Sequence, residues 1–339
     1  LLYNIHRRYG LLRDRAGSGA SEHDTAPLER SHLWFCDLRH IRPDQHGDSQ
    51  GLASACNGSR PGLGHIYLAC GFSDNLLDPK MIIQYLLLLL LVPVAAFSLA
   101  YLIARLTGKV TFLDAAWGIG FVLIAWVSYF AFSTRELPNL LVSLAVSLWG
   151  LRLAWYVVKR IAKTGEDKRY QKILAGYGEN AQTKAFLRLF MLQAVLQYLV
   201  SAAILRMNYS DPKPVGITTW VGIVVFTIGF LFEAVADSQL AGFKRDPNNK
   251  GKILQSWLWK TSRHPNYFGE SLVWLGLAVM SLAYPWGWLA LISPAVITYL
   301  LLFVSGIPIQ EKGKDQKPAW REYADKTPKF VPFIGSKKY

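Results

Sequence analysis

Ionisable, amide and aromatic side chains are concentrated in the stretch TSRHPNYFGES, residues 261–271. Arg263, His264, Asn266, Tyr267 and Glu270 supply a cation, an imidazole, an amide, a phenol and a carboxylate. Ionisable groups near a membrane core are costly unless they are paired or used. We therefore interpret the stretch as a binding site where a loop becomes a helix. A plain polar helix end, with Glu270 favouring the helix N-terminus, is the alternative.

Tryptophans flank this stretch on both sides. Trp274 lies four residues after Glu270, so the two share a helix face once the helix has begun. Trp257 and Trp259 precede the stretch and suit either a ligand site or the aromatic belt of a membrane interface.

Two carboxylates and a cation end the preceding apolar segment. Glu233 and Asp237 are four apart, and Lys244 follows seven residues after Asp237. One helix face would therefore present both carboxylates and then the cation. A solvated helix end is the alternative.

A stripe of Arg152, Tyr156 and Arg160 runs along the segment LWGLRLAWYVVKR at spacings of four. Arg160 could be an interface anchor, but Arg152 lies about two turns inside the helix and needs an anionic partner. Asp114 is one candidate partner, and a bound phosphate is another.

Gln193 and Gln197 also share a helix face. They suit hydrogen bonds between helices as well as contacts to a substrate.

Long apolar segments must position these residues. The chain has 339 residues, 52% of them hydrophobic and 18% charged, which indicates an all-α, polytopic integral membrane protein. Segments able to cross a bilayer are expected at 82–104, 112–132, 139–158, 186–206, 215–235, 268–284 and 287–305.

Residues 1–80 differ in composition from the rest. They hold six of the seven histidines and all three cysteines, and their charges sum to zero. We expect a poorly ordered extension, not necessarily native, followed by a membrane domain at 81–339 with its cofactor half at about 215–339. The Cys and His residues show no metal-ligand spacing, and no metal site is expected.

The basic residues predict the orientation in the membrane. The net charge of +14 falls on residues 81–339, where Lys and Arg gather at 159–184, 244–263 and 312–338. Seven crossings place these regions on one side, which the positive-inside rule makes cytoplasmic, as in a bacterial inner membrane. Six crossings with a re-entrant sixth segment would move the carboxyl-terminal tail to the other side.

Several motifs are absent from the sequence. It contains no GxGxxG after a strand, no GxxxxGK[ST] and no HExxH, and residues 81–339 contain no cysteine. Rossmann, P-loop, zinc-protease and thiol chemistry are therefore unsupported, and side chains on helices and loops must hold any nucleotide.

The sequence SRHPNYFGE, followed by WLG, SGIPIQEK and WREYADKTPKFVPF, resembles the carboxyl-terminal half of the steroid 5-alpha-reductase superfamily, above all its broad bacterial branch. The resemblance covers about residues 111–335. It implies a membrane oxidoreductase that uses NADPH to reduce a carbon–carbon double bond conjugated to a carbonyl, in a lipid-soluble substrate that is steroid-like, isoprenoid or fatty.

The resemblance also implies which residues bind the cofactor. Asn266, Glu270 and Trp274 match the family's N-x-x-G-E-x-x-x-W run, Asp237 and Lys244 match an aspartate and a basic residue of the preceding helix, and Arg152 and Tyr156 match an arginine–tyrosine pair. The expected set is completed by Trp257, Arg263, His264, Tyr267 and Glu311.

The residues that contact the substrate in this family are matched less well by this chain. Neither its substrate-side glutamate and tyrosine nor its histidine-rich tail has a counterpart here. Asp114 is our candidate for the acid that polarises the substrate carbonyl, because burial raises a carboxyl pKa. A paired structural aspartate is the alternative.

A methyltransferase that uses S-adenosylmethionine on isoprenylcysteine or phospholipid is the main competing function. Such enzymes share the Arg-His-Pro motif but follow it with two adjacent glutamates, whereas this chain has Gln310-Glu311. A scaffold or transporter is the third class. The expected partners are a lipophilic substrate and membrane lipids, with neither nucleic acid nor an obligate protein partner.

Overall fold

A computed structural model describes residues 79–164, 168–209 and 213–334. Of the extension predicted at residues 1–80, residues 1–78 lie outside these ranges, and Pro79 and Lys80 begin α2. Within them the chain forms helices and no strand, which confirms the all-α class. In chain order the helices are α2 (Pro79–Thr107), α3 (Phe112–Phe132), α4 (Leu137–Thr164), α5 (Lys168–Ala175), α6 (Ala181–Ala185), the π-helix η2 (Phe186–Met191), α7 (Leu192–Val200), α8 (Ala202–Asn208), α9 (Ile217–Arg245), the 3-10 helix η3 (Pro247–Asn249), α10 (Leu258–Thr261), α11 (Pro265–Ser281), the 3-10 helix η4 (Gly287–Leu291), α12 (Ile292–Tyr299), the π-helix η5 (Leu300–Val304), α13 (Ile307–Glu311) and α14 (Pro318–Lys326).

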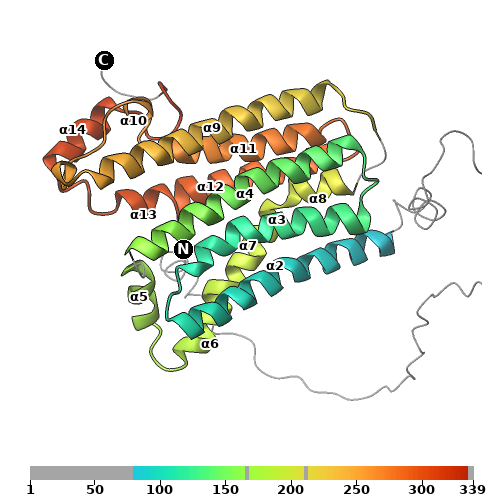
Figure 1. The fold of residues 1–339 in the computed structure, drawn as a ribbon, viewed down its shortest axis with the longest axis horizontal. Helices are drawn as coiled ribbons and strands as arrows, with labels where there is room; N and C mark the ends of the chain where they lie inside the picture. The colour runs from blue at the N-terminus through green and yellow to red at the C-terminus, as the bar shows by residue number, and fades with distance from the viewer. Residues whose placement is uncertain (1–78, 165–167, 210–212, 335–339) are drawn as a thin grey trace, which may run out of the picture. The chain divides into compact units, whose positions relative to one another are not determined.

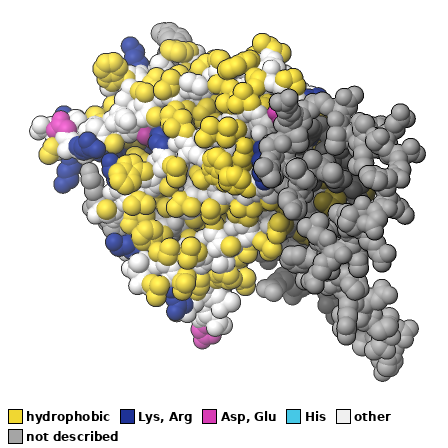
Figure 2. Space-filling view, turned by 45° about the vertical axis from the view of Figure 1, so that its right-hand side comes forward, with side chains coloured by type: hydrophobic (Ala, Val, Ile, Leu, Met, Phe, Trp, Pro, Cys, Tyr) yellow, Lys and Arg dark blue, Asp and Glu magenta, His cyan; other side chains and the backbone are white. Residues whose placement is uncertain are grey.

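Five helical segments are long and apolar enough to cross a membrane, namely α2, α3, α4, α9 and the run 287–311. A bent pair, 181–200 with 202–208, makes a sixth. These helices confirm a multi-pass membrane protein, whereas the count of seven stays a prediction because α11 has only 17 residues. Figure 2 shows a broad apolar face with Lys and Arg at its edges, as lipid contact requires.

The long helices lie side by side, and the short helices α5, α6, α10, α13 and α14 gather at one end of the bundle (Figure 1). We call this the basic end, because the lysines and arginines of residues 244–252 and 312–317 lie there. At the other end, Lys213 Nζ donates to the Ala283 carbonyl at 2.8 Å. The turn after α11 therefore reaches the same end as the turn before α9.

The helix α9 runs ten residues past the predicted end at 235. Polar residues continue it because Glu233 and Asp237 are buried against other side chains instead of facing water. The extension carries Asp237 and Lys244 to the basic end.

The predicted crossing at 186–206 is bent by 50° between α7 and α8. The Ser201 hydroxyl donates to the Gln197 and Tyr198 carbonyls, both at 2.9 Å. Such bonds compete with the helical pattern and often bend a helix.

Glycines bring α9 and α11 into backbone contact. A Cβ on Gly229 would lie 2.6 Å from the Gly269 carbonyl oxygen, and one on Gly269 would lie 2.5 Å from the Glu233 nitrogen. Gly222 and Gly276 make a second such contact further along. Small residues allow membrane helices to approach this closely. The contact sets the carboxylates of α9 beside the first turn of α11.

Candidate active site

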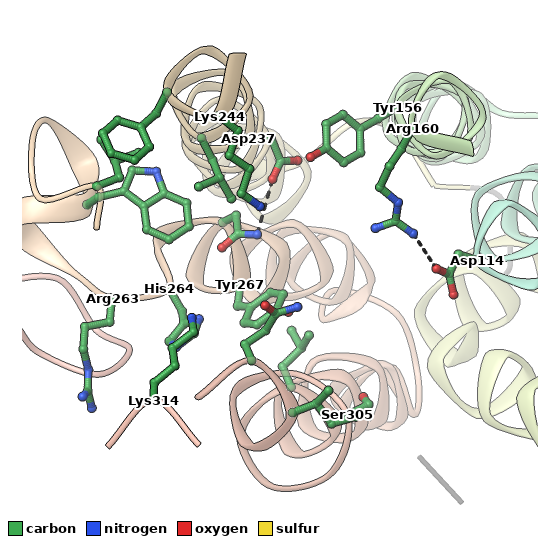
Figure 3. A pocket seen from close by; sticks show the side chains of 18 of the residues that line it. Asp114, Tyr156, Arg160, Asp237, Lys244, Arg263, His264, Tyr267, Ser305 and Lys314 are labelled. Carbon is green, nitrogen blue, oxygen red and sulfur yellow. Dashed lines mark hydrogen bonds and ion pairs between the residues drawn. The ribbon is translucent and has the colours of Figure 1, made fainter. Parts of the chain in front are cut away.

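A cavity of about 1540 Å³ opens at the basic end. Its walls come from α3, α4, α5, η2, α7, α9, α11, α12 and η5, and its rim comes from residues 244–254 and 308–323. In Figure 3, Tyr156 and Lys244 lie on either side of Asp237. The ion pair of Arg160 and Asp114 lies on one side of the cavity, and Arg263, His264 and Lys314 lie on the opposite side. Elements distant in the sequence thus build one continuous site.

A buried ion-pair group lies between α4 and α9. The Arg152 guanidinium donates to Glu233 through Nη2 and to Asp237 Oδ2 through Nη1 at 3.2 Å. Trp149 Nε1 donates to the other Glu233 oxygen at 2.7 Å. The predicted Glu233–Asp237 face is therefore paired with Arg152, and Asp114, one of the two predicted partners, was the wrong partner. These contacts hold the carboxylates at the cavity wall.

The first turn of α11 adds an amide and a carboxylate. Pro265 begins the helix, and Asn266 Nδ2 donates to Asp237 Oδ1 at 3.3 Å. Asn266 Oδ1 is buried, and no described residue donates to it. Glu270 lines the cavity, and within the described ranges its carboxylate has no hydrogen-bond partner. Both groups can therefore accept hydrogen bonds from a ligand.

His264 is held in place from two sides. Its Nε2 lies 2.9 Å from Glu311 Oε1, and its ring stacks on Tyr267 at 5.4 Å between centroids. Arg263 Nε lies 3.4 Å from the same Glu311 oxygen. Burial lowers the pKa of His264, an effect that Glu311 opposes and Arg263 and Lys314 reinforce. We infer a neutral imidazole that donates to Glu311 near pH 7.

The carboxyl-terminal segment packs on the loop that precedes His264. The Tyr323 hydroxyl donates to the Trp259 carbonyl at 2.5 Å, and Arg263 N–H donates to the Pro328 carbonyl at 2.8 Å. The Ser262 hydroxyl donates to Phe330 at 2.7 Å. The chain after α14 thereby holds the loop that leads into α11.

Asp114 lies on a different wall and is paired. Arg160 Nη2 donates to its Oδ2 at 2.7 Å, and the Tyr170 hydroxyl donates to its Oδ1 at 2.5 Å. A proton donor needs a proton on a carboxyl oxygen, but both oxygens here accept. This geometry agrees with the structural alternative for Asp114 and opposes the role of carbonyl-polarising acid.

The rim of the cavity is strongly basic. Its cations come from the end of α9, the loop after it and the tail, and they are Lys244, Arg245, Lys250, Lys252, Lys312, Lys314 and Lys317. Burial lowers the pKa of Lys314, and Lys244 and Lys317 lower it further while Glu311 opposes them. Crowded cations of this kind favour a bound anion.

Most predicted cofactor residues line the cavity. They are Tyr156, Asp237, Lys244, Arg263, His264, Asn266, Tyr267 and Glu270. Arg152 and Glu311 do not line the cavity themselves. They bind residues that do, namely Asp237 and His264. Trp274 is fully buried against Trp149, and Trp257 is 78% exposed, so neither lines the cavity.

Other lining residues escaped the sequence prediction. The predicted cofactor set omitted Glu233 and Arg160, although their spacing with Asp237 and Tyr156 was noticed. Apart from Lys244, the rim lysines were interpreted as a topology signal, because nothing in the sequence shows that residues 250 and 314 line one cavity.

A family model described as "Protein of unknown function (DUF1295)" matches residues 100–327. A steroid 5-alpha-reductase of Gossypium hirsutum is 36% identical over 67 residues, which are 20% of this chain and 24% of that protein. One of Arabidopsis thaliana is 34% identical over 86 residues, or 24% and 31%. A probable O-methyltransferase of Ustilaginoidea virens is 37% identical over 60 residues, or 18% and 21%. The matches thus cover less than a third of these relatives, and no solved structure matches the chain.

Proposed function

The chain belongs to the family described as "Protein of unknown function (DUF1295)", within the steroid 5-alpha-reductase superfamily, and from this premise we propose that it is an NADPH-dependent membrane reductase. The proposed reaction reduces a carbon–carbon double bond conjugated to a carbonyl in a lipid-soluble substrate.

The observation that carries the proposal is one cavity with two chemically different parts. Its rim holds seven lysines and arginines, whereas its inner wall is formed largely by apolar side chains of α3, α4, η2 and η5. Its volume of about 1540 Å³ exceeds the roughly 300–1,000 Å³ of a site for one small molecule. A phosphorylated cofactor and an apolar substrate therefore have room together.

The lining residues fit NADPH. The rim cations suit a pyrophosphate and a 2'-phosphate, which prefer charge-assisted hydrogen bonds. Asn266 Oδ1 and the Glu270 carboxylate can accept from ribose hydroxyls or from a carboxamide. Arg152 would act indirectly, by holding Asp237 in place.

NADPH supplies a hydride when it is bound, and the residues of the chain position the two reactants. Glu233, Asp237 and Asn266 form a fixed polar wall that would hold and orient the bound cofactor. The apolar inner wall excludes water from the reacting carbons. Tyr156 lines the same cavity, and its hydroxyl has no hydrogen-bond partner among the described residues. We therefore assign to it, and not to Asp114, the proton that the α-carbon of the double bond takes up as the hydride adds to the β-carbon.

A methyltransferase remains the second candidate because of the match to a probable O-methyltransferase. S-adenosylmethionine carries one carboxylate and no phosphate, so it offers the rim cations much less negative charge than NADPH does. The basic rim therefore favours the reductase.

Ligand-induced stabilisation of the full chain in detergent tests the proposal. NADPH should raise the unfolding temperature, because a ligand that binds only the folded state stabilises it by about 2.7 kcal/mol at a hundredfold excess over its Kd. NADH, which lacks the 2'-phosphate, should stabilise less. Stabilisation by S-adenosylmethionine without a response to NADPH would reverse the choice.

Matched lysine variants add specificity to this test. Lys250→Gln and Lys314→Gln remove rim charges, whereas Lys260→Gln removes an exposed charge at the same end of the bundle that does not line the cavity. The rim variants should weaken the NADPH effect and the control should keep it. Equal behaviour of all three would contradict a phosphate site at the rim.

A further inference from the structure

Two glutamines one turn apart on α7 face α3 but are used differently. Gln197 is fully buried, and its Nε2 donates to the Trp117 carbonyl at 2.8 Å and to the Ala116 carbonyl at 3.3 Å. Its N–H groups therefore hold α7 against α3. Gln193 makes no bond to a helix backbone and lines the cavity instead.

The orientation of the Gln193 amide is fixed by its neighbour. Trp117 Nε1 can only donate, and it lies 3.1 Å from Gln193 Oε1. The Nε2 is then the end left for a ligand, and within the described ranges no protein atom accepts from it. Gln193 is only 5% exposed. Its Nε2 still meets the cavity space, so an acceptor on a bound molecule can take a hydrogen bond from it.

The surroundings select the chemistry of that acceptor. Leu113, on the helix of Trp117, and Leu189, on η2 directly before α7, line the cavity with Gln193. The ionisable Asp114, one turn before Trp117, is already bound to Arg160 and Tyr170. A charged group would lose its hydration here without a counter-ion. The fitting acceptor is a neutral carbonyl oxygen on an otherwise apolar molecule.

We propose that Gln193 Nε2 binds the carbonyl oxygen of the substrate, an assignment that rests on the proposed reductase function. A hydrogen bond to that oxygen withdraws electron density from the conjugated double bond and stabilises the negative charge that develops on the oxygen as hydride adds. It also fixes which carbon of the substrate faces the cofactor. Gln193 is thereby both a binding residue and a specificity residue.

The test compares two probes that differ only at the carbonyl, cholest-4-en-3-one and cholest-4-ene. Binding to the protein loaded with NADP⁺, which cannot reduce the ketone, is measured in lipid nanodiscs for the wild type, for Gln193→Met and for Gln197→Met. The wild type should bind the ketone about tenfold more tightly, which is the effect of one hydrogen bond of about 1.4 kcal/mol. Gln193→Met should lose this preference and keep its affinity for the alkene. Gln197→Met should keep the preference, although it destabilises the α3–α7 contact.

The outcomes separate this proposal from the function on which it rests. NADPH stabilisation of each variant shows that it is folded, and Gln193→Asn provides a second variant that withdraws the amide by one methylene. A wild type without a NADPH response contradicts the reductase. A NADPH-responsive wild type that binds both probes equally or not at all, or a Gln193→Met that keeps the preference, overturns the role of Gln193 alone. That result would mean that the amide binds only water.

Discussion

Arg152 illustrates what single residues contribute to this site. It lies inside α4, and its guanidinium binds two carboxylates of α9. Three ionisable side chains are therefore largely buried together. The spacing of Glu233 and Asp237 was readable from the sequence because both lie on one helix face. Their pairing with Arg152 was not, because it depends on how α4 packs on α9, more than 80 residues away.

Replacing Arg152 by Met should strongly destabilise the protein. The side chains of Arg152, Glu233 and Asp237 are 20%, 5% and 12% exposed, so the change leaves buried carboxylates without their cation. Loss of one partner of a buried pair costs about 3–5 kcal/mol. Thermal unfolding in detergent measures it. Lys326→Ala breaks the exposed pair with Glu322 and should leave stability unchanged, and an equally stable Arg152→Met would contradict the structural role.

His264 should make stability depend on pH. Burial lowers its pKa in the folded state, with opposition from Glu311 and reinforcement from Arg263 and Lys314. The unfolded chain, whose histidine pKa is about 6.5, then binds the proton first, so stability is complete above that pH and falls as the pH drops toward the folded pKa. Unfolding temperatures between about pH 7.5 and 5 test this. His264→Gln keeps a hydrogen-bond donor that does not titrate, so it should flatten the dependence of the unfolding temperature on pH. An unchanged slope would show that other groups cause the pH dependence.

At the scale of elements, the approach of α9 to α11 builds the polar wall. Hydropathy located both helices, since apolar runs of membrane length are distinctive. It misjudged their ends at the site, ending α9 at 235 and starting α11 at 268, whereas the structure has 245 and 265. A hydropathy window places the end of a helix where polar residues begin. Here those polar residues are paired inside the protein, so the helix continues through them. The closeness of the pair depends on glycines, which hydropathy does not register.

Adding one methyl group at Gly269 should therefore disrupt the site. Its Cβ would lie 2.5 Å from the Glu233 nitrogen and 2.7 Å from the Gly229 oxygen, which are backbone atoms and cannot rotate away. Gly269→Ala should force α11 from α9, lower the unfolding temperature and weaken NADPH binding. Gly242→Ala is the matched control on α9, because nothing lies within 4 Å of its Cβ. If both variants behave alike, close packing is not what holds the two helices together.

At the scale of the molecule, the basic loops and the tail meet around one cavity. Lys250 follows α9 and Lys314 follows α13, yet both line the rim. The sequence predicted their common side of the membrane from charge, but a shared cavity arises only when all helices are packed. Two segments that line one water-accessible rim must face the same compartment.

The same geometry bears on the number of crossings. The helix α11 spans about 25 Å at 1.5 Å per residue. The turn after it contacts the region before α9, since Arg206 Nε and Lys213 Nζ donate to the Pro285 and Ala283 carbonyls. Because α11 starts at the basic end and finishes at the other end, we expect it to cross the membrane, and seven crossings stay the prediction to be tested.

Cysteine labelling in intact cells tests this topology. Cys36, Cys56 and Cys70 are first replaced by Ser, and single cysteines then replace Glu136, Trp286, Lys250 or Asp325. The first two sites lie in turns at the other end of the bundle, and the last two lie at the basic end. If the basic end is cytoplasmic, an impermeant maleimide should label Glu136→Cys and Trp286→Cys directly, but Lys250→Cys and Asp325→Cys only after permeabilisation. A re-entrant α11 predicts the opposite for Trp286→Cys and Asp325→Cys, and would separate the tail from the loop with which it forms the rim.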